Sequence, residues 1–217
     1  MSATPVQVPL PSGDVLDGDL VVPADAVGLV VFAHGSGSSR HSPRNQSVAA
    51  TLQDRALATL LVDLLTPAEE QRDLATGELR FDLHLLADRL AAALQWAGEA
   101  AQTASLPVGL FGASTGGGAA LLTAAGLPAS VRAVVSRGGR PDLADDALPQ
   151  VNCPVLLLVG GRDEQVLRLN EQARERLVAP SELVVVPGAT HLFEEPGALE
   201  QVARLSADWF RRHLPTT

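Results

Sequence analysis

A serine between two glycines, in the run Gly112-Ala113-Ser114-Thr115-Gly116, is the strongest chemical signal in this chain. The apolar run from Val108 to Phe111 predicts a strand before it, and the glycines and alanines after it predict a helix. A serine at such a sharp turn has strained backbone angles and crowded neighbours, and small flanking residues relieve both. The pattern therefore predicts that Ser114 is a nucleophile for acyl transfer.

An acid and a histidine follow the serine, each just after a predicted buried strand. Asp163 follows Val155 to Val159, and His191 follows Leu183 to Val186. Because loops at the carboxyl ends of parallel strands converge, we expect the three side chains to meet. Ser114 would attack a carbonyl, His191 would take and return its proton, and Asp163 would orient the imidazole.

Each member of this triad has a simpler interpretation. The serine would be a turn residue, the histidine a loop residue, and the aspartate a cap for the helix after it. Other acids near these loops compete for the aspartate's role, namely Glu164, Glu194 and Glu195.

An oxyanion needs two hydrogen-bond donors. The backbone amide of Thr115, directly after the nucleophile, is the first candidate. The run His34 to Ser39 follows the predicted strand Gly28 to Ala33, and within it Ser36 is the candidate for the second donor. The alternative is a flexible glycine-serine turn. His34 precedes the nucleophile, so we expect it to orient this loop rather than act as the base.

Arginines near the same edge suggest substrate recognition. Arg40 and Arg44 follow the oxyanion loop, and Arg137 and Arg140 follow the predicted strand Val131 to Val135. Guanidinium groups bind carboxylate or phosphate bidentately, and we take Arg137 and Arg40 as candidate substrate-binding residues. Arg137 is the better candidate because two glycines follow it. Pairing with the abundant acids is the alternative.

The remaining elements must position these residues. Strands and helices alternate, which predicts one domain over residues 1–217 with an open, mostly parallel sheet and helices on both faces. We predict antiparallel edge strands near the amino terminus at 6–8 and 15–22. A βαβ unit should follow, with strands at 28–33 and 59–64 and a helix at 44–55. Three later helices are expected at 81–99, 165–177 and 199–213. We expect 67–79 to be a solvated loop, with a position over the pocket as the alternative, and 136–154 to be too short for a lid domain.

The amino-acid composition limits the classes of partner that this chain could bind. The chain has 217 residues, of which 46% are hydrophobic, enough for one well-buried core. Its net charge of -9 argues against a nucleic-acid or anionic-membrane surface and for a small-molecule substrate. Cys153 is the only cysteine, and His41, His84 and His213 lack metal-ligand spacing, so we expect no disulfide, metal or other cofactor. The amino terminus lacks a signal-peptide pattern, so we expect a cytoplasmic protein. The oligomeric state, monomer or homodimer, stays open.

The motifs His34-Gly35, Gly112 to Gly116, Asp163 and His191 together resemble the α/β-hydrolase superfamily, and within it the dienelactone-hydrolase-like group of small, lidless hydrolases. The resemblance implies the α/β-hydrolase fold. Dienelactone hydrolases proper use a cysteine nucleophile, whereas this chain has Ser114, which favours a carboxylesterase acting on small esters or lactones. Acyl transfer to another acceptor, thioester hydrolysis and a non-catalytic scaffold are the alternatives.

Overall fold

The computed structural model describes residues 2–214 and contains one eight-stranded sheet in the order β1-β2-β4-β3-β5-β6-β7-β8. β1 pairs antiparallel with β2, and β2 pairs antiparallel with β4. All other neighbouring strands are parallel. The predicted fold class, with antiparallel strands at the amino-terminal edge, is confirmed.

The elements alternate along the chain as the sequence predicts. The strands are β1 (Thr4–Pro9), β2 (Val15–Val21), β3 (Leu29–Ala33), β4 (Ala58–Val62), β5 (Val108–Ala113), β6 (Ala133–Arg137), β7 (Val155–Gly160) and β8 (Ser181–Val186). The helices are α1 (Pro43–Gln53), α2 (Pro67–Thr76), α3 (Leu83–Glu99), α4 (Thr115–Gly126), α5 (Glu164–Arg176) and α6 (Ala198–His213). Short 3-10 segments are η1 (Leu79–Phe81) and η2 (Pro141–Gln150).

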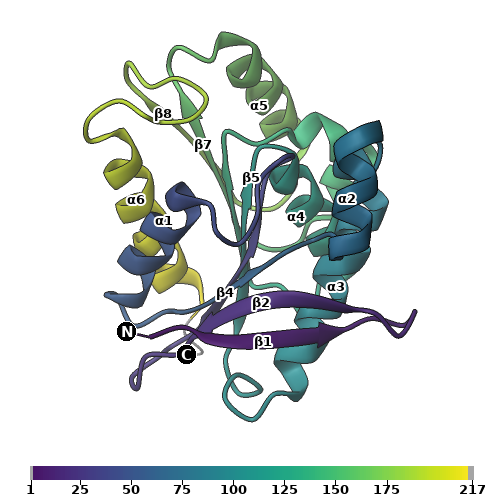
Figure 1. The fold of residues 1–217 in the computed structure, drawn as a ribbon. Coiled ribbons are helices and arrows are strands. Elements are labelled where there is room, and N and C mark those ends of the chain that lie inside the picture. Colours follow the sequence, from purple (N-terminus) through teal and green to yellow (C-terminus); the bar gives the residue numbers. More distant parts are fainter. Residues whose placement is uncertain (1, 215–217) are drawn as a thin grey trace.

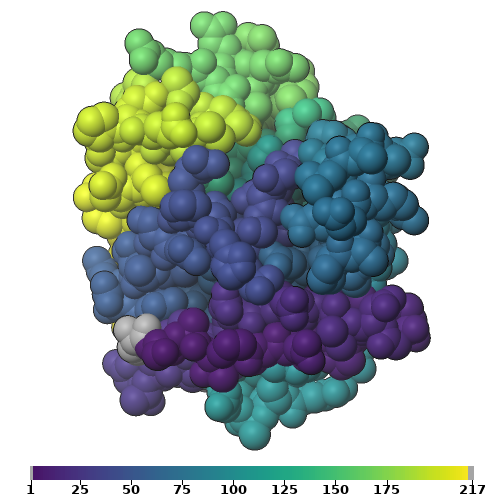
Figure 2. Space-filling view, in the orientation of Figure 1, coloured from purple at the N-terminus to yellow at the C-terminus, as the bar shows by residue number. Residues whose placement is uncertain are grey.

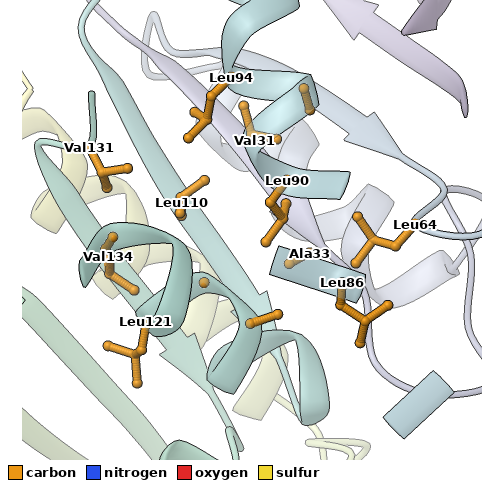
Figure 3. Packing of buried hydrophobic residues seen from close by; sticks show 14 of the residues in the cluster. Val31, Ala33, Leu64, Leu86, Leu90, Leu94, Leu110, Leu121, Val131 and Val134 are labelled. Atoms are coloured by element: carbon orange, nitrogen blue, oxygen red, sulfur yellow. The ribbon is translucent and has the colours of Figure 1, made fainter. Parts of the chain in front are cut away.

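Two apolar layers hold the helices against the sheet, one on each face. On one face Val31 and Leu110 pack with α3 and α4, as Figure 3 shows for Leu90 and Leu121. On the other face Phe32 and Phe111, whose ring centroids are 4.8 Å apart, pack with α1 and α6. Successive side chains of a strand point to opposite faces, which is why strands buried on both faces are apolar throughout. Figure 1 shows α1 and α6 on the opposite side of the sheet from α3 and α4.

The sequence-based prediction that differs most from the structure concerns residues 67–79. Residues 67–79 are not a solvated loop, because Pro67–Thr76 is a helix. Thr66 and Glu69 form a capping box, in which the side chain of each accepts the backbone N–H of the other, and Gly77 ends the helix with a φ of 68°. Few residues of α2 are apolar, so the sequence shows no hydrophobic periodicity there, whereas the Thr66 and Glu69 capping box is visible in the sequence. Figure 2 shows the blue segment containing α2 above the purple β1–β2 hairpin on the same face of the molecule.

A smaller difference concerns β6, which spans Ala133–Arg137 rather than Val131 to Val135. Arg137 is therefore the last residue of the strand, paired in register with Ala113 of β5. This shift matters for the site, because a strand end fixes a side chain more firmly than a loop does.

None of the helices formed within residues 2–214 combines the length and the apolar character needed to cross a bilayer.

Candidate active site

Ser114 lies at a sharp corner between β5 and α4, with φ 52° and ψ -122°. Its backbone is held on both sides: its N–H donates to the Arg137 carbonyl at 3.2 Å, and its carbonyl accepts from the Gly117 and Arg140 amides at 2.9 and 3.1 Å. A positive φ at a non-glycine residue costs conformational energy, so the surrounding contacts must maintain it. The chain therefore presents this serine at the carboxyl edge of the sheet in a strained turn.

The glycines of the motif are sterically required. A Cβ at Gly112 would lie 2.5 Å from the Gly117 Cα, and a Cβ at Gly116 would lie 2.6 Å from the His34 carbonyl oxygen. These are backbone contacts that no side-chain rotation relieves. They confirm the steric reason for small residues that the sequence suggested.

Asp163 follows β7 and is the residue before α5, yet its side chain makes no capping hydrogen bond. Its Oδ2 instead accepts a hydrogen bond from His191 Nδ1 at 2.6 Å. The proton on Nδ1 leaves Nε2 of a neutral imidazole as an acceptor. The structure thus gives the aspartate the orienting contact rather than the capping contact.

Close backbone packing brings the loops of Asp163 and His191 together. A Cβ at Gly160 would lie 2.5 Å from the Thr190 carbonyl oxygen. The Arg162 amide donates to the Ala189 carbonyl at 2.9 Å. The pairing of the two side chains therefore rests on a fixed frame.

Each of the three competing acids has another partner. Glu195 accepts the Thr190 amide at 3.0 Å, and hydrogen bonding from Thr190 lowers the pKa of that carboxyl. Glu194 lies 3.5 Å from Arg44, and Glu164 is largely exposed beside Arg168. Asp163 is the acid whose carboxylate contacts the histidine.

The segment at the end of β6 lies against both the His191 ring and the Ser114 backbone. A Cβ at Gly138 would lie 3.5 Å from ring atoms of His191, and the neighbouring Arg137 carbonyl holds the Ser114 amide. No hydrogen bond joins the Ser114 hydroxyl to His191 within the described chain. Catalytic hydrogen bonds are often long before substrate binds. The structure brings the three residues to one end of the sheet.

His34 anchors the candidate oxyanion loop. Its Nδ1 donates to the Gly35 carbonyl, and its Nε2 accepts the Leu64 amide, both at 3.0 Å. Burial is the main cause of a lowered pKa for His34, opposed in part by the Gly35 carbonyl and by Asp63. A neutral imidazole thus links the end of β3 to the segment after β4, which fits an orienting role.

The loop anchored by His34 passes directly behind Ser114. A Cβ at Gly35 would lie 3.1 Å from the Ser114 Cβ. Thr115, the other expected donor, is buried in the first turn of α4. Ser36 follows Gly35 and lines a cleft.

This cleft is partly open to solvent. The loop from His34 to Ser39 forms one wall, and Glu70, Asp73 and Leu74 of α2 form another. The segment expected to be a solvated loop therefore forms part of the wall of this cleft, whose lining residues do not include Ser114 or His191. These α2 residues were missed by sequence reasoning, and the capping box was the signal that would have found them.

The candidate substrate-binding arginines differ. Arg40 is engaged: its guanidinium pairs with Asp63 and lies 3.6 Å from Asp19, and its amide donates to Asp63 at 2.6 Å. This is the ion-pairing alternative, so the assignment of Arg40 to substrate binding is not supported. Arg140 likewise holds Asp142 through two hydrogen bonds of 2.8 and 2.7 Å. Among residues 2–214, Arg137 has no such partner.

Within residues 2–214, histidine, cysteine and acidic side chains form no group of three or more that could hold a metal ion. Cys153 is buried, and burial raises the pKa of its thiol to about 11, so it is an inert core residue.

The sheet, the strained serine and the aspartate–histidine pair define an α/β hydrolase. The sequence profile of the dienelactone hydrolase family matches residues 66–214, and the chain belongs to that family. A dienelactone hydrolase from Anabaena variabilis is 56% identical, with a TM-score of 0.96 and 98% of each chain covered. Est1E from Butyrivibrio proteoclasticus has the same fold at 17% identity, with a TM-score of 0.81 and coverage of 96% of this chain and 98% of that one.

Curated relatives add one further fact. A protein of Mycobacterium tuberculosis named "Putative phosphoribosyl transferase" is 60% identical over 197 residues, which make up 91% of this chain and 44% of that protein. The chain thus spans less than half the length of the curated relatives that it matches.

Proposed function

We propose that this hydrolase cleaves small carboxylic esters or lactones through an acyl-enzyme formed on Ser114. The observation that carries the proposal is the 2.6 Å contact between Asp163 and His191 at the end of the sheet that presents Ser114. A serine hydroxyl is a weak nucleophile and needs a base beside it. A histidine whose tautomer is fixed by a carboxylate is such a base.

In the proposed reaction His191 removes the Ser114 proton as the oxygen attacks the substrate carbonyl. The amide of Thr115 and the amide of Ser36 stabilise the tetrahedral oxyanion, and Asp163 stabilises the imidazolium. His191 then returns the proton to the leaving alcohol, and the acyl group stays on Ser114. Water, activated by the same histidine, releases the acid and restores the serine.

The rigid frame of the site supports this assignment. The strained turn fixes Ser114, the hydrogen bonds of His34 fix the loop behind it, and the Gly160 contact fixes the two loops of the acid and base. Preorganised donors stabilise a transition state without the cost of rearranging at the moment of reaction. The arrangement suits acyl transfer to water.

Phosphoribosyl transfer is not proposed for this chain. The curated relative so named is matched over only 44% of its length, and the matching part has the fold of a hydrolase. That name therefore gives no reason to assign transferase chemistry to the present residues.

The test is hydrolysis of p-nitrophenyl esters from acetate to decanoate by the wild type and by Ser114→Ala. We expect turnover that favours short acyl chains and disappears in the variant, with both proteins giving the same circular dichroism spectrum. Equal turnover by the two proteins would refute the assignment of Ser114. No turnover by either, together with no reaction with a fluorophosphonate, would favour a non-catalytic scaffold.

A further inference from the structure

Asn170 is a buried polar residue in the middle of α5, the helix that begins directly after Asp163. Its side-chain amide donates two hydrogen bonds, to the Gly139 carbonyl at 3.0 Å and to the Val166 carbonyl at 2.8 Å. Since both partners are carbonyls, the amide nitrogen and not the oxygen must face them. The Oδ1 atom is then left without a donor among the described residues.

The Asn170 side chain is a poor choice for stability alone. A buried acceptor without a donor is unfavourable, and an apolar side chain of the same shape would avoid that cost. Asparagine is also a weak helix former, because its side chain competes for backbone hydrogen bonds. Local rules of this kind are most often broken at functional sites. The hydrogen bond from α5 to the distant Gly139 carbonyl is therefore the feature to explain.

The segment of residues 137–140, which contains Gly139, contacts two candidate catalytic residues. Its first carbonyl accepts the Ser114 amide at 3.2 Å, and its last amide donates to the Ser114 carbonyl at 3.1 Å. A Cβ at Gly138 would lie 3.5 Å from the Cε1 and Nδ1 atoms of His191, so the backbone there lies against the imidazole. The position of this segment therefore affects how the serine and the histidine lie relative to each other.

The Asn170 side chain fixes this segment from the side of α5. The Gly138 amide donates to the Leu158 carbonyl at 2.7 Å, which ties the segment to β7. Within residues 2–214, Asn170 is the only side chain that hydrogen-bonds to the backbone of the segment. Because α5 follows Asp163 directly, this bond links the helix after the acid to the segment that contacts the nucleophile and the base.

We propose that Asn170 is a positioning residue for hydrolysis at Ser114. Its side-chain amide holds the Gly139 carbonyl, and through residues 137–140 it keeps the His191 ring aligned with the Ser114 hydroxyl. This inference rests on the proposed function for its effect on catalysis, but the hold on the segment can be measured without turnover. Misplacing a reacting group by about 1 Å lowers a rate by up to about 100-fold.

Two variants separate the hydrogen bond to Gly139 from the rest of the side chain. Asn170→Leu keeps the branched shape and removes both donors together with the unpaired acceptor. Asn170→Ser keeps a donor for Val166, as Ser206 donates to the Val202 carbonyl at 2.7 Å within α6. The serine side chain is one bond shorter and does not reach Gly139. Loss of activity in both variants would therefore come from the bond to Gly139.

Thr123→Val is the matched control at a buried position of α4. The Thr123 hydroxyl also donates within its own helix, to Ala119 at 2.9 Å, and across to Ala87 of α3 at 3.4 Å, but to none of residues 137–140. The three variants and wild type are compared on p-nitrophenyl acetate. We expect both Asn170 variants to lower kcat about 10- to 100-fold with KM nearly unchanged, and Thr123→Val to retain the wild-type kcat.

Amide hydrogen exchange measures the hold on the segment without catalysis. In both Asn170 variants the amides of Ser114, Gly138 and Arg140 should exchange about 10-fold faster, whereas the amides of β3 should exchange as in wild type. Faster exchange throughout the sheet together with a large fall in Tm would show that Asn170 only supports the fold.

A wild-type kcat in both Asn170 variants, or unchanged exchange at the three amides, would overturn the proposal. Lack of turnover by wild type would instead be a failure of the proposed function, and the exchange rates would still decide whether Asn170 holds the segment.

Discussion

Asp163 and His191 are joined by a 2.6 Å hydrogen bond although they are 28 residues apart and follow different strands. Asp163 stands where a capping residue for α5 would stand, but its carboxylate contacts the imidazole instead. The first turn of a helix thereby gives up a stabilising cap. Loss of a stabilising local contact is expected where a side chain belongs to a functional site.

The first prediction concerns that pair. Asp163→Asn should lower kcat by about 10⁴-fold, because an amide does not fix the imidazole tautomer that the reaction needs. His191→Ala should lower kcat further, to about 10⁶-fold, since the base itself is lost. Rates with a p-nitrophenyl ester measure both. Glu164→Gln, at the exposed neighbouring acid, is the control and should retain activity; a strong loss there would contradict the assignment of Asp163.

The second prediction concerns the serine turn. Gly116→Ala should destabilise the protein by about 3 kcal/mol or more, because the new Cβ meets backbone rather than a movable side chain. Gly126→Ala is the matched control at the other end of α4, where a Cβ meets nothing within 4 Å. It should raise the free energy of unfolding by up to about 1 kcal/mol. Urea denaturation measures both changes, and similar values for the two variants would contradict the steric account.

The third prediction concerns α2. Thr66→Ala should cost about 1 kcal/mol by removing the hydroxyl that accepts the Glu69 amide. Because α2 forms a wall of the cleft, the variant should also raise KM more than it lowers kcat. Thr76→Ala, an exposed threonine at the other end of the helix, should change neither quantity by a comparable amount. Unchanged stability in Thr66→Ala would indicate that the cap is not formed.

The fourth prediction concerns pH and His34. Its pKa is lowered in the folded protein, chiefly by burial, so on acidification the unfolded chain takes up a proton near the ordinary value of 6.5 before the folded chain does. Stability should therefore fall as the pH drops below about 6.5. His34→Gln should be less stable near neutral pH but should lose less on acidification. Urea titrations across this pH range decide it, and parallel pH profiles for the two proteins would contradict the proposed neutral state of His34.

The sequence predicted the serine turn well because its requirements are local. Gly112 and Gly116 are needed within a few residues of Ser114, so the motif itself records them. The order of strands and helices was equally readable, since buried parallel strands are apolar throughout. The α2 helix was missed because polar residues cover most of it, and only its Thr66 and Glu69 caps distinguish it from a loop.

The partners of charged groups were not readable from the sequence. Arg40 lies in the loop after β3 and Arg137 is the last residue of β6, yet Arg40 pairs with Asp63, which is 23 residues away, whereas Arg137 has no ion-pair partner among the described residues. Likewise, only the folded arrangement shows that Asp163 contacts His191 rather than capping α5. Such choices depend on which loops converge in space, and a linear pattern does not contain that information.

The most direct test of the central claim is covalent labelling by a fluorophosphonate, followed by mass spectrometry of the peptides. A serine activated by a histidine forms a stable phosphonyl adduct, whereas an ordinary serine does not. The account predicts one adduct, on Ser114, that is lost in Ser114→Ala and strongly slowed in His191→Ala. An adduct on another residue, or ester turnover by a protein whose Ser114 stays unlabelled, would contradict it.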